Sequence, residues 1–133
     1  MSDAPRHVLD HLGVPVRDIG ESRRFYETAL EPLGFGVVME FDDPPVLGIG
    51  LPRMPQLWLS EGEPGAPVHV ALHAADRARV DAFHAAALAA GGRDNGAPGL
   101  RPHYHPSYYA AYVLDPDGNN VEAVCHSADS PSQ

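Results

Sequence analysis

Two stretches of this chain determine its fold, namely His11-Leu-Gly-Val-Pro-Val-Arg-Asp18 and His69-Val-Ala-Leu-His-Ala-Ala-Asp76. They are related by a constant offset of 58 residues. An internal repeat determines architecture, because each copy is one supersecondary unit that must bury its apolar face against a neighbour. The two stretches therefore predict two similar halves. The same offset relates these further pairs: Phe25 and Phe83, Leu30 and Leu88, Gly34 and Gly92, Val14 and Leu72, Ala29 and Ala87.

The length of the chain indicates that the two repeats are halves of one domain. With 133 residues, of which 44% are hydrophobic, the chain is long enough for one domain with a sizeable core. We expect a single domain over 1–133, built from a first module at 7–60 and a second module at 67–126. The segment 61–66, rich in Glu, Gly and Pro, is predicted to link them.

Composition excludes several classes of function. A net charge of -9 argues against nucleic-acid partners and against binding to an anionic membrane surface. No apolar run approaches the length of a membrane span, and no N-terminal segment has the pattern of a secretion signal. The single cysteine, Cys125, cannot form an internal disulfide, which suits a reducing compartment. We therefore expect a cytoplasmic protein.

Periodicity predicts the same order of elements in both halves. An alternating strand over 8–16 places Leu12, Val14 and Val16 on one face and His11 on the other. Asp18 then supplies an N-cap for a helix. The first half continues as a helix at 19–30 and strands at 36–41, 46–51 and 56–60. The second half is predicted as a strand at 68–74, a helix from Asp76 to about Ala90, a Pro- and Gly-rich segment to Pro106, and strands at 108–115 and 119–125. Each half is thus a strand, a helix and up to three strands. The fold class is α+β.

The turn between the last two strands predicts their register. Pro116-Asp117-Gly118 suits a three-residue hairpin loop, with the glycine in the left-handed position. Pairing Asp115 with Asn119 places Glu122 opposite Tyr112. Glu122 should therefore share a sheet face with aromatic rings.

Glu122 and two histidines are the candidate metal ligands. A carboxylate in an apolar strand is costly to bury unless it is paired or bound to a cation. Taken singly, Glu122 could lie on a solvated face or pair with Arg101, and each histidine could make an ordinary hydrogen bond. His11 and His69 occupy equivalent places in the repeat, however, so one cup could bring both to Glu122. Two imidazoles and one carboxylate form a facial triad that suits Fe, Zn, Mn, Ni or Co and leaves positions open for substrate.

The same residues carry a resemblance to a known superfamily. The segments His11 to Asp18, Ser22 to Leu30 and Leu33-Gly-Phe35 resemble the opening of the vicinal oxygen chelate superfamily, which includes glyoxalases, bleomycin-resistance proteins and extradiol dioxygenases. The ending Tyr112-Val-Leu-Asp-Pro-Asp-Gly-Asn-Asn-Val-Glu122 is similar to its closing hairpin. The resemblance implies two paired βαβββ modules that form one curved mixed-sheet cup. It also implies a divalent metal ion on His11, His69 and Glu122, and a homodimer in which the cup lies between two subunits.

Two departures separate the chain from named branches of that superfamily. Glyoxalase I carries a fourth ligand, a glutamate, where this chain has Trp58. The fosfomycin-resistance branch carries a threonine two residues after its first ligand, where this chain has Gly13. The resemblance therefore implies the superfamily and no particular branch.

Aromatic and basic residues near Glu122 are candidates for contact with substrate. Tyr112, Tyr104 and His103 are predicted to donate or accept protons or hydrogen bonds. The alternative for the segment 101–109 is a surface loop whose tyrosines cover apolar area. The residues predicted to line the pocket are Trp58, His73, Tyr108 and Arg101.

These residues support three hypotheses of function. The first is a small metal-dependent enzyme, a lyase, dioxygenase or transferase, that binds neighbouring oxygens of a small organic substrate. The second is a metal-free binding protein that sequesters a drug or metabolite, which Trp58 favours because an indole is a stacking surface. The third is a scaffold with a vestigial site.

Overall fold

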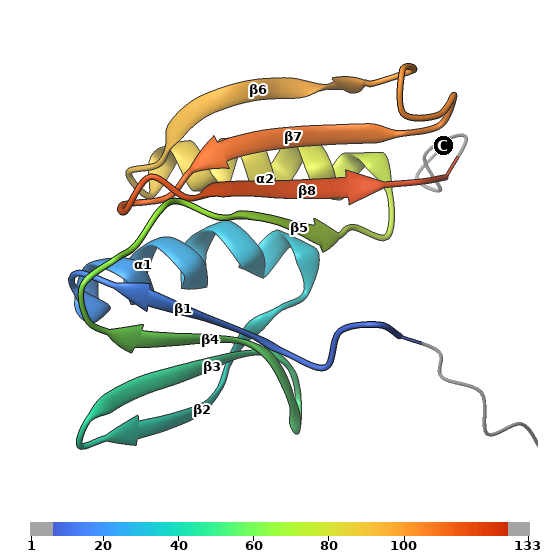
Figure 1. The fold of residues 1–133 in the computed structure, drawn as a ribbon. Helices are drawn as coiled ribbons and strands as arrows, with labels where there is room; N and C mark the ends of the chain where they lie inside the picture. Colours follow the sequence, from blue (N-terminus) through green and yellow to red (C-terminus); the bar gives the residue numbers. More distant parts are fainter. Residues whose placement is uncertain (1–6, 128–133) are drawn as a thin grey trace, which may run out of the picture.

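The computed structural model describes residues 7–127, which form two sheets and two α-helices (Figure 1). The first half contains β1 (Leu12–Val16), α1 (Ile19–Leu30), the short 3-10 helix η1 (Glu31–Leu33), β2 (Gly36–Asp42), β3 (Pro45–Leu51) and β4 (Met54–Glu61). The second contains β5 (His69–His73), α2 (Arg77–Ala89), β6 (Arg93–Leu100), β7 (Tyr109–Leu114) and β8 (Asn120–Cys125). Neither α-helix is long and apolar enough to cross a membrane.

The two sheets have the same topology. Their strand orders are β1-β4-β3-β2 and β5-β8-β7-β6, with one parallel pair at the edge of each sheet and antiparallel pairs elsewhere. Within residues 7–127, no strand of one sheet pairs with a strand of the other. The predicted α+β fold of two βαβββ units is confirmed. Each sheet has one face against a helix, and we call the other its open face.

Equivalent residues start both helices and fill both helix interfaces. The Asp18 carboxylate accepts from Glu21 N, and the Asp76 carboxylate accepts from Arg79 N, as N-caps do. Phe25 and Phe83 are fully buried in one core that both modules share. The helices pack against each other, so neither module buries its apolar face alone.

The Pro- and Gly-rich segment, to which the sequence pattern assigned no particular strand, contains one. Arg93–Leu100 forms β6, an edge strand that pairs with β7 through two register shifts. An edge strand needs partners on one side only, so it tolerates Gly96, Pro98 and Gly99 where a central strand would not. The sequence signal failed because those residues suppress the usual strand pattern.

The predicted register of the last hairpin is confirmed. Tyr112 pairs with Glu122, and Asp115 N donates to the Asn119 carbonyl. The buried Asp115 carboxylate accepts from Asp117 N, Asn119 N, Asn119 Nδ2 and the Tyr26 hydroxyl of α1. The Asp-Pro-Asp-Gly-Asn motif therefore builds the turn and also joins the second module to the first.

Candidate metal centre

Glu122 and His69 lie together on the open face of the second sheet. The Glu122 side chain is 1% exposed, and its Oε1 lies 2.7 Å from His69 Nε2. β5 and β8 set this contact, because they run parallel with Ala71 opposite Glu122 and His69 two residues before Ala71. The solvated alternative for Glu122 is thereby excluded, and its partner is a histidine instead of Arg101.

Two tyrosines of the neighbouring strand and loop complete the surroundings of Glu122. The Tyr108 hydroxyl donates to Glu122 Oε2 in a short hydrogen bond, and Tyr112 lies opposite Glu122 in the register. Burial, reinforced by this hydrogen bond, raises the pKa of Tyr108 above its usual value. Burial and the Glu122 charge also raise the pKa of Tyr112. Both phenols therefore stay protonated at neutral pH and act as donors.

The loop between β6 and β7 covers part of this face with rings. Tyr104 packs on Tyr108 with ring centroids 4.8 Å apart, and His103 packs on Tyr104 at 4.2 Å. Tyr104 is 61% exposed. Neither His103 nor Tyr104 makes a hydrogen bond to Glu122 or His69 in residues 7–127. The predicted catalytic set is thus split, with Tyr112 beside Glu122 and the other two in an outer layer.

His11 is not brought to the other two predicted ligands within one chain. Its Nδ1 lies 2.7 Å from Asp10 Oδ1, and its side chain is 57% exposed. Because a carboxylate only accepts, Nδ1 carries the proton and the Nε2 of a neutral ring keeps its lone pair. In residues 7–127, no group of three or more His, Cys, Asp or Glu side chains could hold a metal ion.

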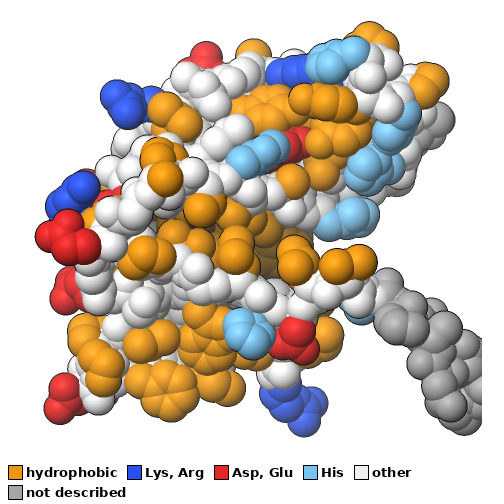
Figure 2. Space-filling view, in the orientation of Figure 1, with side chains coloured by type: hydrophobic (Ala, Val, Ile, Leu, Met, Phe, Trp, Pro, Cys, Tyr) orange, Lys and Arg blue, Asp and Glu red, His pale blue; other side chains and the backbone are white. Residues whose placement is uncertain are grey.

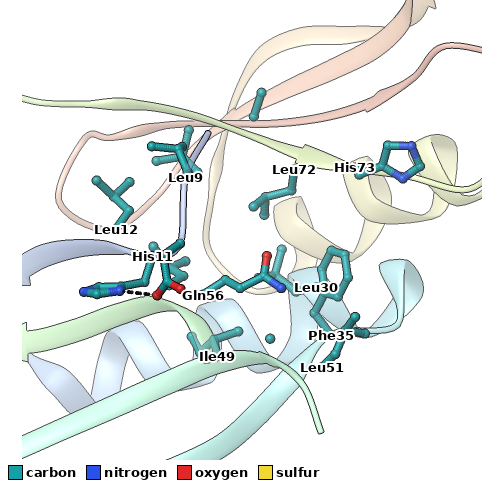
Figure 3. A pocket seen from close by; sticks show the side chains of 15 residues that line it. Leu9, His11, Leu12, Leu30, Phe35, Ile49, Leu51, Gln56, Leu72 and His73 are labelled. Atoms are coloured by element: carbon teal, nitrogen blue, oxygen red, sulfur yellow. Dashed lines mark hydrogen bonds and ion pairs between the residues drawn. The ribbon is translucent and has the colours of Figure 1, made fainter. Parts of the chain in front are cut away.

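The space between the two modules is an apolar cavity that is separate from Glu122. It lies between the free edges of β1 and β5, and its lining includes Leu30, Phe35 and His73. Figure 3 shows the His11 ring directed away from this cavity, toward its hydrogen-bonded carboxylate. His73 therefore lines this cavity, whereas His69 and Glu122 do not.

Trp58 occupies the place in the first sheet that Glu122 occupies in the second. Gly13 pairs with Trp58 as Ala71 pairs with Glu122, and Gly13 and Ala71 are equivalent in the repeat. The indole lies over Gly48, where an added Cβ would come within 2.9 Å of the ring. Phe41 stacks on Trp58, with ring centroids 6.2 Å apart and planes 20° apart. The open face of the first sheet therefore carries an aromatic platform.

Side chains are distributed unequally over the two halves. Figure 2 shows histidines gathered mainly on the upper half, which is the second module, whereas hydrophobic side chains lie on both halves. Exposed apolar residues of the first module include Phe41 at 55% and Met54 at 54%. A solvent-facing apolar area of this kind is typical of a ligand or partner surface.

Three contacts of this region were not predicted from the sequence. Asp10 pairs with His11, Phe41 stacks on Trp58, and His105 Nε2 lies 2.7 Å from His126 Nδ1. Ser107 N donates to His105 Nδ1, so His105 Nε2 is the donor to His126. Continuing the predicted pairing of Asp115 with Asn119 along the hairpin places His126 opposite Tyr108, and this is the one sequence signal for a contact of His126 in this region.

The fold places the chain in a class of proteins, those built from paired βαβββ modules. The sequence profile of the Glyoxalase/Bleomycin resistance protein/Dioxygenase superfamily matches residues 8–123. The chain belongs to this superfamily. No curated protein matches it at a significant level.

Solved structures of similar fold agree with this assignment. A glyoxalase/bleomycin resistance protein from Albidiferax ferrireducens T118 is 28% identical with a TM-score of 0.77, over 91% of this chain and 100% of that one. A glyoxalase-related enzyme from Fulvimarina pelagi is 19% identical with a TM-score of 0.66, over 95% and 96% of the two chains. A glyoxalase I variant from Zea mays is 23% identical with a TM-score of 0.67, over 87% of this chain and 46% of that one.

Proposed function

We propose that this protein is a metal-dependent enzyme that binds neighbouring oxygens of a small organic substrate. His69 and Glu122 would hold a divalent cation together with His11. The observation that carries the proposal is the buried Glu122 carboxylate, which faces the open side of the sheet and contacts His69 Nε2 at 2.7 Å. Burying a carboxylate on a ligand-facing surface is costly, and a functional site is a common reason for it.

The donor atoms fit a divalent cation. His69 Nε2 and Glu122 Oε1 converge to 2.7 Å, so an imidazole nitrogen and a carboxylate oxygen, both common ligands of divalent metals, are directed at one place. Tyr108 fixes the second oxygen of Glu122, and Asp10 fixes the Nδ1 of His11. Such supporting hydrogen bonds orient ligand side chains and leave the Nε2 of histidine as the ligand atom. These ligand types accept Fe, Zn, Mn, Ni and Co.

We infer that His11 comes from a second copy of the chain. One chain separates His11 from the His69–Glu122 pair, leaves the edges of β1 and β5 free, and exposes the Trp58–Phe41 platform. A twofold homodimer would place the first module of each copy against the second module of the other, which completes two equivalent sites. The platform would then form one wall of the cup, opposite the tyrosines.

When bound, the cation would supply Lewis-acid polarisation of the substrate oxygens. The residues of this chain would position that chemistry. His69, Glu122 and His11 hold the site, and Tyr108 keeps Glu122 oriented. Tyr112 stays protonated beside Glu122 and is placed to donate a hydrogen bond or a proton to a substrate oxygen. The Trp58–Phe41 platform excludes water on the facing side.

Mixing two inactive variants tests both parts of the proposal. His11→Ala and Glu122→Ala should each lose bound metal, measured by elemental analysis of protein purified without chelator. After subunit exchange, the mixture should regain metal at roughly a quarter of its sites, because half of the dimers are mixed and each contains one intact site. No recovery on mixing would overturn the site shared between two copies. Wild-type protein with negligible metal would overturn the metal proposal itself.

A metal-free binding protein is the second candidate, and the Trp58–Phe41 platform favours it. Two rings in a nearly parallel stack can accept a planar ligand without any cation. Glu122 already has hydrogen-bond partners for both oxygens within the chain. Metal analysis separates the two candidates, since the binding protein would purify without stoichiometric metal and would lose ligand affinity on Trp58→Ala.

A further inference from the structure

Arg101 is a fixed cation on the open face of the second sheet. Its Nη1 donates to the Gly99 carbonyl and its Nη2 to the Ala97 carbonyl, each at 2.8 Å. The guanidinium also lies over the ring of Tyr112, 5.2 Å from the centroid. These contacts hold the side chain in one place, but carbonyls and a phenol ring are neutral. The charge is oriented and is not cancelled.

The edge strand β6 makes room for this guanidinium. A Cβ at Gly96 would lie 2.8 Å from the Tyr112 ring and 3.3 Å from Arg101 Nη2, and a Cβ at Gly99 would lie 3.1 Å from Arg101 Nη1. Side chains at either position would crowd the arginine. The two glycines that hid this strand in the sequence are therefore the ones that allow Arg101 to lie flat against the sheet.

Arg101 has no carboxylate partner among residues 7–127. Arg17, Arg23 and Arg79 each make an ion pair with an Asp or Glu within 4.0 Å, whereas Arg101 makes none. Arg24, Arg53, Arg77 and Arg93 also make no ion pair within residues 7–127. What distinguishes Arg101 is its position over the Tyr112 ring, next to Glu122 and His69. A guanidinium has five N–H groups, and the two carbonyl bonds leave donors for an incoming anion.

The cation lies next to the proposed ligands. Tyr112 contacts Arg101 on one side and pairs with Glu122 on the other, and its ring centroid lies 6.2 Å from that of His69. Arg101, Tyr112, Glu122 and His69 thus follow one another across the sheet. A molecule held at His69 and Glu122 would extend over Tyr112 toward Arg101.

We propose that Arg101 recognises a carboxylate on the substrate, so that the substrate class is a small organic carboxylate whose other oxygens are held at His69 and Glu122. The position of the other substrate oxygens at His69 and Glu122 rests on the proposed function, whereas recognition of a carboxylate by Arg101 does not. A planar guanidinium matches the two oxygens of a carboxylate. Among residues 7–127, Arg101 is the only arginine whose guanidinium lies over Tyr112, so one cation faces a ligand there and a single negative charge fits better than a phosphate dianion.

A matched pair of probes tests the inference by fluorine NMR titration. We would titrate 4-fluorobenzoate and the neutral 4-fluorobenzamide into the zinc-loaded full chain, and into the same protein after chelation. Wild type should bind the benzoate at least about tenfold more tightly than the benzamide. Arg101→Gln should weaken benzoate binding about tenfold and leave benzamide binding within about twofold, and Arg101→Lys should fall between because it keeps the charge without the planar fork.

The controls separate this inference from the proposed metal site. Arg93→Gln removes an exposed arginine at the start of β6, the strand that Arg101 directly follows, and this variant should bind both probes as wild type does. If Arg101→Gln does not fold, Arg101→Lys carries the test. Equal affinity of wild type for both probes, unchanged benzoate binding in the Arg101 variants, or no benzoate binding at all would overturn the inference. Preference for benzoate in chelated protein would uphold it even if the metal proposal failed.

Discussion

The two modules are alike on their helix-facing sides and unlike on their open faces. Phe25 and Phe83 are both fully buried, and Asp18 and Asp76 both cap helices. At the matched position on the open faces, by contrast, one module carries Trp58 and the other Glu122. One open face is an apolar platform, and the other combines a carboxylate, a histidine, two tyrosines and an arginine.

This contrast shows which positions were free to change. Close packing in a shared core tolerates little change of shape, so equivalent core residues stay similar. Side chains on an open face have no such constraint from the fold. Polar chemistry could therefore concentrate in the second module, while the first retained one histidine and acquired stacking surface.

The largest expected effect concerns the matched core residues. Phe25→Ala and Phe83→Ala should each lower the free energy of unfolding by about 3–5 kcal/mol, because each leaves a large cavity. Urea denaturation followed by circular dichroism would measure both. Trp58→Ala, on an open face, should cost less than about 2 kcal/mol. If Trp58→Ala proved as costly as the phenylalanine variants, the distinction between buried and open faces would fail.

The matched open-face residues should differ in metal affinity. Glu122→Gln keeps the shape of the side chain but removes its charge, and it should weaken zinc binding about a hundredfold. Loss of a residue that only supports a ligand already weakens metal binding by about 10–100-fold, and a ligand itself should matter at least as much. Trp58→Phe should leave zinc affinity within about twofold. Competition against a chelating dye would measure both variants in parallel. Equal affinities for the two variants would show that Glu122 is not a ligand.

The contribution of the hydrogen bond between Tyr26 and Asp115 to the free energy of unfolding should depend on pH. Burial, with the Asp115 charge next in importance, raises the pKa of Tyr26 well above its usual value. The unfolded chain releases this proton near pH 10 and the folded chain does so only at higher pH, so the stabilisation is complete below pH 10 and is lost as pH rises. At pH 8, Tyr26→Phe should cost about 1–2 kcal/mol, because Asp115 loses a donor.

Comparing pH 8 with pH 11 distinguishes this effect from a loss of packing. The difference between wild type and Tyr26→Phe should shrink at pH 11, because only the wild type loses stability through Tyr26. Tyr104→Phe serves as the control, since Tyr104 is largely exposed and makes no hydrogen bond to Asp115. A difference that stays constant between the two pH values would contradict the assignment.

Much of the fold could be predicted because local signals agreed with the repeat. Alternation, the two aspartate caps and the Pro116–Gly118 turn placed nearly every element and the last register. β6 could not be predicted, because Gly96 and Pro98 remove the pattern of a strand while the pairing to β7 that stabilises it is distant in the sequence. Local propensity does not report such tertiary pairing.

The candidate site was predictable only where strand geometry determined it. The register placed Tyr112 opposite Glu122, and the parallel pairing brought His69 there too. Tyr108 lies in the loop just before β7, so its reach to Glu122 depends on the direction of its side chain, which no register specifies. Repeat symmetry makes His11 equivalent to His69, but equivalence does not determine the distance between the two modules.

The smallest expected effect compares the turns that close the two modules. Gly118 has φ 87° between β7 and β8, whereas Arg53 has φ 61° between β3 and β4, in the left-handed region that costs a non-glycine residue about 1 kcal/mol. Gly118→Ala should therefore lower the free energy of unfolding by about 1 kcal/mol. Arg53→Gly should change it by less than about 0.5 kcal/mol, because relief of strain is offset by greater freedom of the unfolded chain. Urea midpoints would show both, and a clear stabilisation by Arg53→Gly would mean that the first module stores strain at this turn that the second module avoids.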